Sequence, residues 1–111
     1  MDFENKIREL KIELPEAKAP VGSYVATKIS GNLLYVSGQI SISKNGELIK
    51  GKVGKDLTTE DFIEQPKVIN GASDLIASIF GDAGMHTRAA ISTNSLPLGV
   101  SVEVDAIFEL K

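Results

Sequence analysis

Apolar residues recur at helical spacing in two parts of the chain. Phe3, Ile7 and Leu10 follow one another at i, i+4 and i+7, which predicts a short amphipathic helix within residues 2–12. An apolar face with the same period predicts a longer helix over residues 66–80. This second face consists of Val68, Ala72, Leu75, Ile76 and Ile79.

Three glycines bear on the longer helix. Gly81 and Gly84 follow its last apolar positions and are typical stop signals. Gly71 lies inside the helix, where glycine costs up to about 1 kcal/mol relative to alanine. A close packing neighbour is one reason to expect a glycine there.

Alternating and β-forming positions predict the strands. Runs at residues 24–29 and 33–36 flank Gly31-Asn32, a pattern typical of a β-hairpin. Further strands are predicted at residues 40–43, 87–93 and 100–108, of which the last alternates most regularly between apolar and polar residues. A β-meander, one long helix and two closing strands together predict an α+β domain.

Composition narrows the class of protein. With 111 residues the chain suits one domain, and 42% hydrophobic residues with a mean hydropathy of +0.04 indicate a globular protein. The net charge of −3 and 5% aromatic residues argue against nucleic-acid binding. The acidic N-terminus and the lack of an apolar run of about 20 residues argue against a signal peptide and a membrane span, so we expect a cytoplasmic protein.

Few residues suggest chemistry by themselves. The chain has no cysteine, and its one histidine, His86, has no obvious serine or cysteine partner, which favours a structural loop residue over a general base. One histidine and scattered carboxylates do not have the spacing of metal ligands, so no metal site is predicted. Arg88 opens a predicted strand and is either a carboxylate clamp or a solvated strand end. Glu103 and Asp105 share a polar strand face. They either form a functional carboxylate pair or simply lie on the solvent-exposed face of an antiparallel sheet.

Several short motifs, taken in order, resemble the RidA/YjgF family. The matching segments are Gly22-Ser23-Tyr24, with Ser23 where the family has proline, Leu34 to Ile40 with Ser37-Gly38-Gln39, Thr87-Arg88-Ala89-Ala90, Leu96-Pro97, and Val102 to Ile107. Two further segments, Leu10 to Pro20 and Gln65 to Ser73, resemble one subgroup of the family whose function is poorly defined. The resemblance covers nearly the whole chain. It implies a chorismate-mutase-like mixed sheet packed by helix, formed by a single domain over residues 1–111. A helix and a strand of that fold are missing near residues 59–62, so we expect a shortened or rearranged version.

The family resemblance also implies a function. Many family members hydrolyse reactive 2-enamine and 2-imine acids such as 2-aminoacrylate to 2-keto acids and ammonia, without a cofactor. Glu103 and Tyr24 would then be catalytic, with Tyr24 reaching the pocket from a neighbouring subunit of a homotrimer. Residues expected to bind the carboxylate-bearing substrate are Arg88, Ala90, Ser37, Gln39 and Asn70. The alternatives are a non-catalytic binder of small carboxylates, an endoribonuclease, and a purely structural role.

Overall fold

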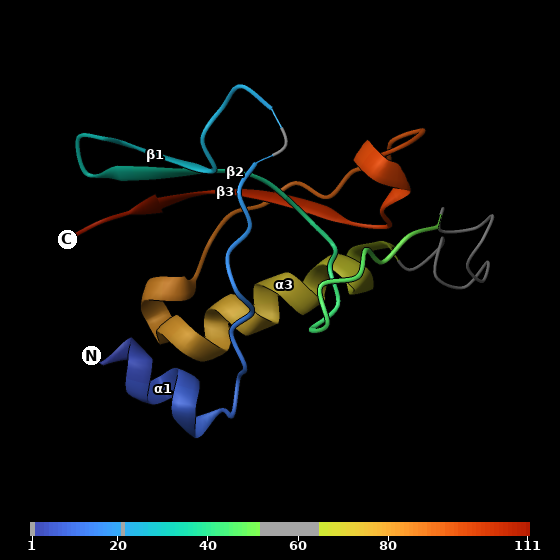
Figure 1. The fold of residues 1–111 in the computed structure, drawn as a ribbon. Helices are drawn as coiled ribbons and strands as arrows, with labels where there is room; N and C mark the ends of the chain where they lie inside the picture. Colours follow the sequence, from blue (N-terminus) through green and yellow to red (C-terminus); the bar gives the residue numbers. More distant parts are fainter. Residues whose placement is uncertain (1, 21, 52–64) are drawn as a thin grey trace. The chain divides into compact units, whose positions relative to one another are not determined.

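The computed structural model describes residues 2–20, 22–51 and 65–111 of the chain (Figure 1). These residues fall into two compact units. The helical unit comprises Met1–Leu14 with Val53–Asn94, and the sheet unit comprises Pro15–Lys52 with Ser95–Lys111. The predicted loss of a segment near residues 59–62 lies outside the described residues.

The helical unit contains α1 (Phe3–Glu9), α3 (Gln65–Phe80) and the 3-10 helix η1 (Gly81–Gly84). Both α-helices were predicted from the apolar spacing. Helix α1 starts where the Asp2 carboxylate accepts a hydrogen bond from the Asn5 backbone N–H at 3.2 Å. This cap satisfies one of the N–H groups that a helix start leaves without a partner. Pro66 lies in the first turn of α3, where its missing N–H costs nothing.

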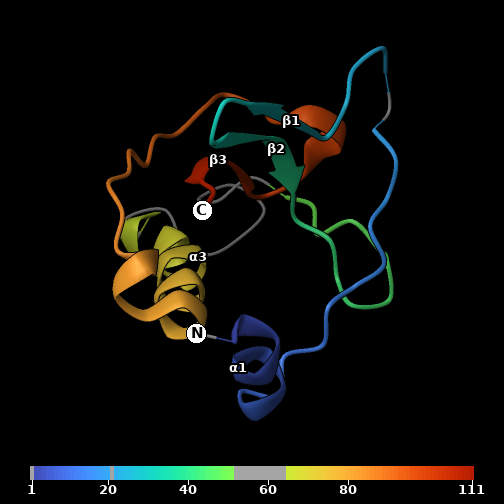
Figure 2. The same ribbon diagram turned by 90° about the vertical axis from the view of Figure 1, so that its left-hand side faces the viewer.

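An aromatic pair joins the two helices. The rings of Phe3 and Phe80 meet edge to face, with centroids 4.7 Å apart and planes at 70°. Such a pair stabilises by about 0.5–1.5 kcal/mol beyond its area. Ile79, next to Phe80, is one of the few buried apolar residues among those described. The C-terminal end of α3 therefore holds α1 (Figure 2).

Glycines end α3 as predicted, and one of them permits close packing. Gly81 has a left-handed φ of +59°, which ends the α-helix after Phe80. Gly84 is buried, and a Cβ built on it would lie 2.6 Å from the Ile76 carbonyl oxygen, so only glycine fits. Around Gly71 no described atom lies within 4 Å of a built Cβ. Among the described residues, no close neighbour therefore accounts for Gly71.

The sheet unit contains three antiparallel strands in the order β1-β2-β3 (Figure 2). Their bounds are Thr27–Ser30 for β1, Leu33–Ile40 for β2 and Glu103–Glu109 for β3. The hairpin predicted around Gly31-Asn32 is present, and Gly31 supplies the left-handed φ of +60° that the turn needs. Strand β1 starts at Thr27, three residues after the predicted start.

Alternation on β3 agrees with the predicted pattern. Val104, Ala106 and Phe108 are half-buried, whereas Asp105 and Glu109 are exposed. On the exposed face, Tyr35 of β2 and Ile107 of β3 are register partners, and they expose 42% and 62% of their surface. The polar face of the sheet thus also carries an apolar pair.

The register of β2 against β3 shifts by one residue. Val36 pairs with Ala106 and Gln39 pairs with Val104, so Ser37 and Gly38 together oppose Asp105. Two residues opposite one are the pattern of a β-bulge, which bends its strand and redirects the side chains beyond it.

Two predicted strands do not form as expected. Residues 87–93 are not part of a strand, and the sheet of the described residues is antiparallel throughout, without the parallel part expected of a mixed sheet. Residues 40–43 form no separate strand either: Ile40 ends β2, and Ile42 makes a single bridge to Leu48 across the Asn45-Gly46 turn. The strand predicted at residues 100–108 starts later, because β3 begins at Glu103. Before it, Pro97–Gly99 form the 3-10 helix η2, and Val100 makes only an isolated bridge to Lys50.

Candidate functional site

Glu103 lies over the bulge of β2. Its side chain packs so closely on Gly38 that a Cβ added there would lie 2.0 Å from Glu103 Oε1 and 2.8 Å from Cδ. Glycine at position 38 is what leaves room for the carboxylate. Glu103 is half-buried and, among the described residues, no partner forms a hydrogen bond or ion pair with its carboxylate. The carboxylate therefore has acceptor capacity for a ligand or water.

Ser37 and Gln39 flank Gly38 and are fixed by backbone contacts. The Ser37 N–H donates to the Ala26 carbonyl at 2.9 Å, and Gln39 Nε2 donates to the Ser37 carbonyl at 3.0 Å. Tyr24 precedes β1 and exposes 56% of its surface. Its ring lies beside Gly22, where a Cβ would be 3.1 Å away. The structure thus gathers Ser37, Gln39 and Glu103 at the bulge.

Arg88 belongs to the helical unit and contacts Ser73, which in turn contacts His86. Its Nη1 donates to Ser73 Oγ at 2.9 Å, and the same hydroxyl lies 3.0 Å from His86 Nε2. The other ring nitrogen, Nδ1, lies 2.6 Å from the Gly84 carbonyl oxygen. Ser73 is on α3, so this cluster joins the helix to the segment that follows η1.

The remaining predicted residues of the helical unit lie around this cluster in the sequence. Asn70 is exposed on α3, one turn before Ser73, and Ala90 is half-buried two residues after Arg88. Arg88 and Glu103 belong to different units, so their meeting in one pocket stays a prediction.

Sequence reasoning missed the partner of His86. The expectation that it lacks a serine neighbour is wrong, because Ser73 Oγ is within hydrogen-bond distance. The two residues are 13 positions apart, and they meet because the chain turns at Gly81 and Gly84 and packs closely against Ile76. The only signal in the sequence was this pair of glycines between a helix and the single histidine.

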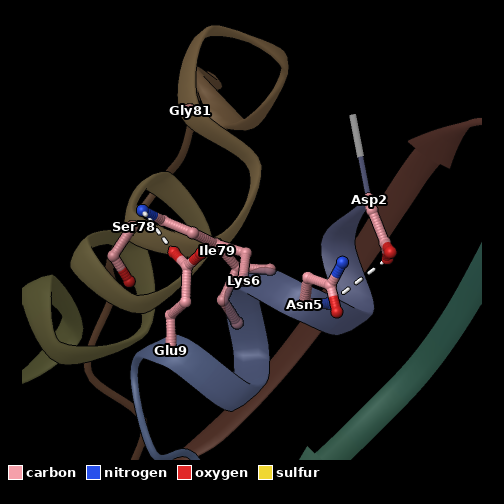
Figure 3. Close-up of a pocket in the computed structure, with 7 residues that line it drawn as sticks. All are labelled: Asp2, Asn5, Lys6, Glu9, Ser78, Ile79 and Gly81. Carbon is pink, nitrogen blue, oxygen red and sulfur yellow. Dashed lines mark hydrogen bonds and ion pairs between the residues drawn. The ribbon is translucent and has the colours of Figure 1, made fainter.

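A shallow cleft of about 430 Å³ lies elsewhere in the helical unit, between α1 and the end of α3 (Figure 3). Charged side chains occupy its rim, and Lys6 Nζ is 3.7 Å from Glu9 Oε2. The cleft contains none of the predicted site residues. Its lining consists of Asp2, Asn5, Lys6, Glu9, Ser78, Ile79 and Gly81.

The described part of the chain contains neither a cluster of metal ligands nor a membrane-spanning helix. No three His, Cys, Asp or Glu side chains gather there in a way that could hold a metal ion. No helix among those residues has the length and apolar character needed to cross a membrane.

Comparisons with known proteins bear on this fold and site. No protein-family model matches the chain. The chain is 34% identical to protein TCP17 of Trypanosoma cruzi, over 94% of this chain and 91% of that protein. It is 29% identical to the RutC family protein PH0854 of Pyrococcus horikoshii, over 82% of this chain and 90% of that one. The crystal structure of "a putative endoribonuclease" from Shewanella oneidensis is 28% identical and superposes with a TM-score of 0.87, covering 97% of this chain and 99% of that chain.

These similarities show that the chain is an α+β protein with the YjgF and chorismate-mutase-like fold. Its glutamate Glu103 packs over the bulge formed by Ser37-Gly38-Gln39. The chain belongs to the RidA/YjgF family, which confirms the predicted family and fold class. The alignment with the Trypanosoma protein spans 146 positions, more than the 111 residues here, so that protein has residues with no counterpart in this chain. Their place near residues 59–62 stays a prediction.

Proposed function

We propose that this chain hydrolyses reactive 2-enamine and 2-imine acids, such as 2-aminoacrylate, to 2-keto acids and ammonia. The observation that carries the proposal is the Glu103 carboxylate, packed over Gly38 and without a hydrogen-bonding partner among the described residues. A carboxylate held in this way can accept a proton from water, which is the general-base step that hydrolysis of an imine needs.

The proposed reaction divides the work between two charged residues. Arg88 binds the substrate carboxylate through its planar set of N–H donors. Glu103 takes a proton from water while the water oxygen bonds to the carbon of the protonated imine, whose C=N π electrons move to nitrogen. Glu103 then returns this proton to the amine nitrogen of the carbinolamine, ammonia leaves as the C–N bond breaks, and the hydroxyl proton passes to Glu103 as the keto group forms. The imine carbon is already electrophilic, so these steps require only positioning and proton transfer.

Tyr24 enters the proposal from a second copy of the chain. Its ring is exposed, which leaves it available to complete a neighbouring subunit's pocket. The exposed pair of Tyr35 and Ile107 supplies apolar surface for such a contact. We propose a homotrimer, and light scattering that finds a stable monomer in solution would remove this part of the proposal.

Endoribonuclease activity is the second candidate, because the similar Shewanella protein carries that name. The charge of this chain counts against it, since 12 basic residues are outnumbered by 15 acidic ones. RNA cleavage that persists in chelator and disappears in Arg88→Ala would favour this reading. Binding of a 2-keto acid without turnover of the imine would favour a non-catalytic binder instead.

The deciding experiment measures the hydrolysis of 2-aminoacrylate generated in situ by a serine dehydratase. We expect the wild-type chain to accelerate ammonia release and Arg88→Ala to lose the acceleration. Arg8→Ala is a matched control, because Arg8 is an exposed arginine on α1 whose Nη2 contacts only the local Asn5 side chain, at 2.7 Å. A folded wild-type chain that gives no acceleration would overturn the proposal.

A further inference from the structure

The cluster of Ser73, His86 and Arg88 defines the direction of each of its hydrogen bonds. The Gly84 carbonyl oxygen can only accept, so the neutral His86 ring carries its hydrogen on Nδ1 and leaves Nε2 as an acceptor. Arg88 can only donate, so Ser73 Oγ accepts from Nη1. The Ser73 hydroxyl hydrogen then points to His86 Nε2. The result is a relay from Arg88 through Ser73 and His86 to the backbone.

Two members of this relay, Ser73 and the Gly84 carbonyl, belong to α3 and to the turn packed against it. Ser73 is one turn before Ile76 on α3, and Gly84 packs against the Ile76 carbonyl so closely that no side chain fits. The acceptor for His86 therefore lies in a turn that packs on α3, the helix that carries Ser73. A hydrogen-bond chain anchored on a helix and on the turn packed against it restricts the rotation of every side chain within it.

We propose that Ser73 and His86 are positioning residues for Arg88. Ser73 fixes the guanidinium at Nη1, and His86 fixes the Ser73 hydroxyl so that its lone pair faces Arg88. A preorganised guanidinium loses less conformational freedom when it binds a carboxylate, so the pair raises the affinity for the ligand without contacting it. This inference rests on the proposed function, in which Arg88 binds the substrate carboxylate.

The first test reads the relay itself and needs no ligand. Because the chain contains one histidine, its ring nitrogen signals in a ¹⁵N NMR spectrum are unambiguous. We expect the neutral ring to carry its hydrogen on Nδ1, and Ser73→Ala to shift both the Nε2 signal and the Arg88 side-chain N–H signals. A ring protonated on Nε2 instead, or Arg88 signals that are unchanged in Ser73→Ala, would overturn the inference.

The second test measures the binding of pyruvate, the 2-keto acid formed from 2-aminoacrylate, by calorimetry. Loss of a hydrogen bond to a charged group predicts a Kd about tenfold higher in Ser73→Ala. Ser73→Thr keeps the hydroxyl and should restore binding. Ser78→Ala is the matched control, since Ser78 is on the same helix and its hydroxyl bonds only to the Leu75 carbonyl, at 2.8 Å.

Two variants of His86 separate positioning from mere packing. Glutamine can place an amide oxygen near the position of Nε2 and accept from Ser73, whereas asparagine reaches only the position of Nδ1. We expect His86→Gln to bind pyruvate within about twofold of the wild type and His86→Asn to resemble Ser73→Ala. Wild-type affinity in both variants would overturn the role of His86.

The outcomes also distinguish this inference from the proposed function. A wild-type chain that binds pyruvate in a Ser73-dependent way but does not hydrolyse 2-aminoacrylate would refute the function and support the positioning role. If the wild-type chain hydrolyses 2-aminoacrylate and Ser73→Ala leaves the Kd for pyruvate unchanged, the function would be supported and the positioning role refuted. A wild-type chain that binds no pyruvate would refute the positioning role as well, because Arg88 would then have no carboxylate to receive.

Discussion

The helical and sheet units hold their candidate residues by different means. In the helical unit, side chains fix side chains: Ser73 and His86 form the relay that holds Arg88. In the sheet unit, the backbone does this work, because a register shift brings Gly38 beneath Glu103 and the missing Cβ leaves room for the carboxylate. The first arrangement should respond to changes in hydrogen-bonding chemistry, and the second to changes in space next to the backbone.

The largest expected effect concerns Glu103. Replacing it by glutamine keeps the shape but removes the base, so we expect turnover to fall about a hundredfold while pyruvate binding changes little. Asp105→Asn is the matched control, since Asp105 is an exposed carboxylate two residues along the same strand. Equal losses of turnover and of binding in Glu103→Gln would mean that Glu103 only shapes the pocket.

Gly84 tests the packing that supports the helical unit. Alanine would place its Cβ 2.6 Å from a backbone oxygen that cannot move alone, so we expect the free energy of unfolding to fall by about 1–3 kcal/mol. Urea unfolding measures it. Gly71→Ala is the control, because a Cβ there meets no described atom within 4 Å and should stabilise α3 by up to about 1 kcal/mol. Similar effects of the two substitutions would contradict the close approach at Gly84.

Gly38 tests the space beneath Glu103. Alanine at this position collides with the end of a flexible side chain, so the carboxylate should move aside at little cost in stability. Turnover should nevertheless fall about tenfold, since catalysis depends on the position of the base. If the loss arises through Glu103, then Gly38→Ala should add little further loss in a chain that already carries Glu103→Gln.

The smallest expected effect concerns the aromatic pair of the helical unit. Phe3→Leu keeps apolar volume but removes the edge-to-face contact with Phe80, so the free energy of unfolding should fall by about 0.5–1.5 kcal/mol. Thermal unfolding gives the comparison with Leu14→Ala, an exposed position where we expect a change within about 0.5 kcal/mol. No difference between these two variants would mean that the pair does not hold α1 to α3.

Much of the fold could be predicted because its signals are local. The apolar spacing of α1 and α3, the Gly31-Asn32 turn and the alternation along β3 each lie within one short segment. The strand predicted at residues 87–93 failed for the opposite reason. Its residues suit extended backbone, but a strand also needs a neighbouring strand in the right register, which the sequence of the segment alone does not reveal.

The candidate site could be predicted only in part. The motif around Ser37 and the segments with Arg88 and Glu103 drew attention through their likeness to a family. The bulge that brings Gly38 beneath Glu103 could not be foreseen, because a register shift is a property of two strands and not of either sequence alone. The Ser73–His86 contact was hidden similarly, since it depends on how closely the turn at Gly84 packs against α3.

The pairing of β2 with β3 also sets the order in which this protein can be assembled. The hairpin of β1 and β2 joins neighbouring segments and can form early, but Asn32 bonds to Glu109, 77 residues later. During synthesis the sheet therefore stays a two-stranded ribbon, marginal on its own, until Glu103–Glu109 has left the ribosome. Folding that waits for such distant partners is slow. Deleting β3 should consequently leave a chain that does not complete this sheet at all.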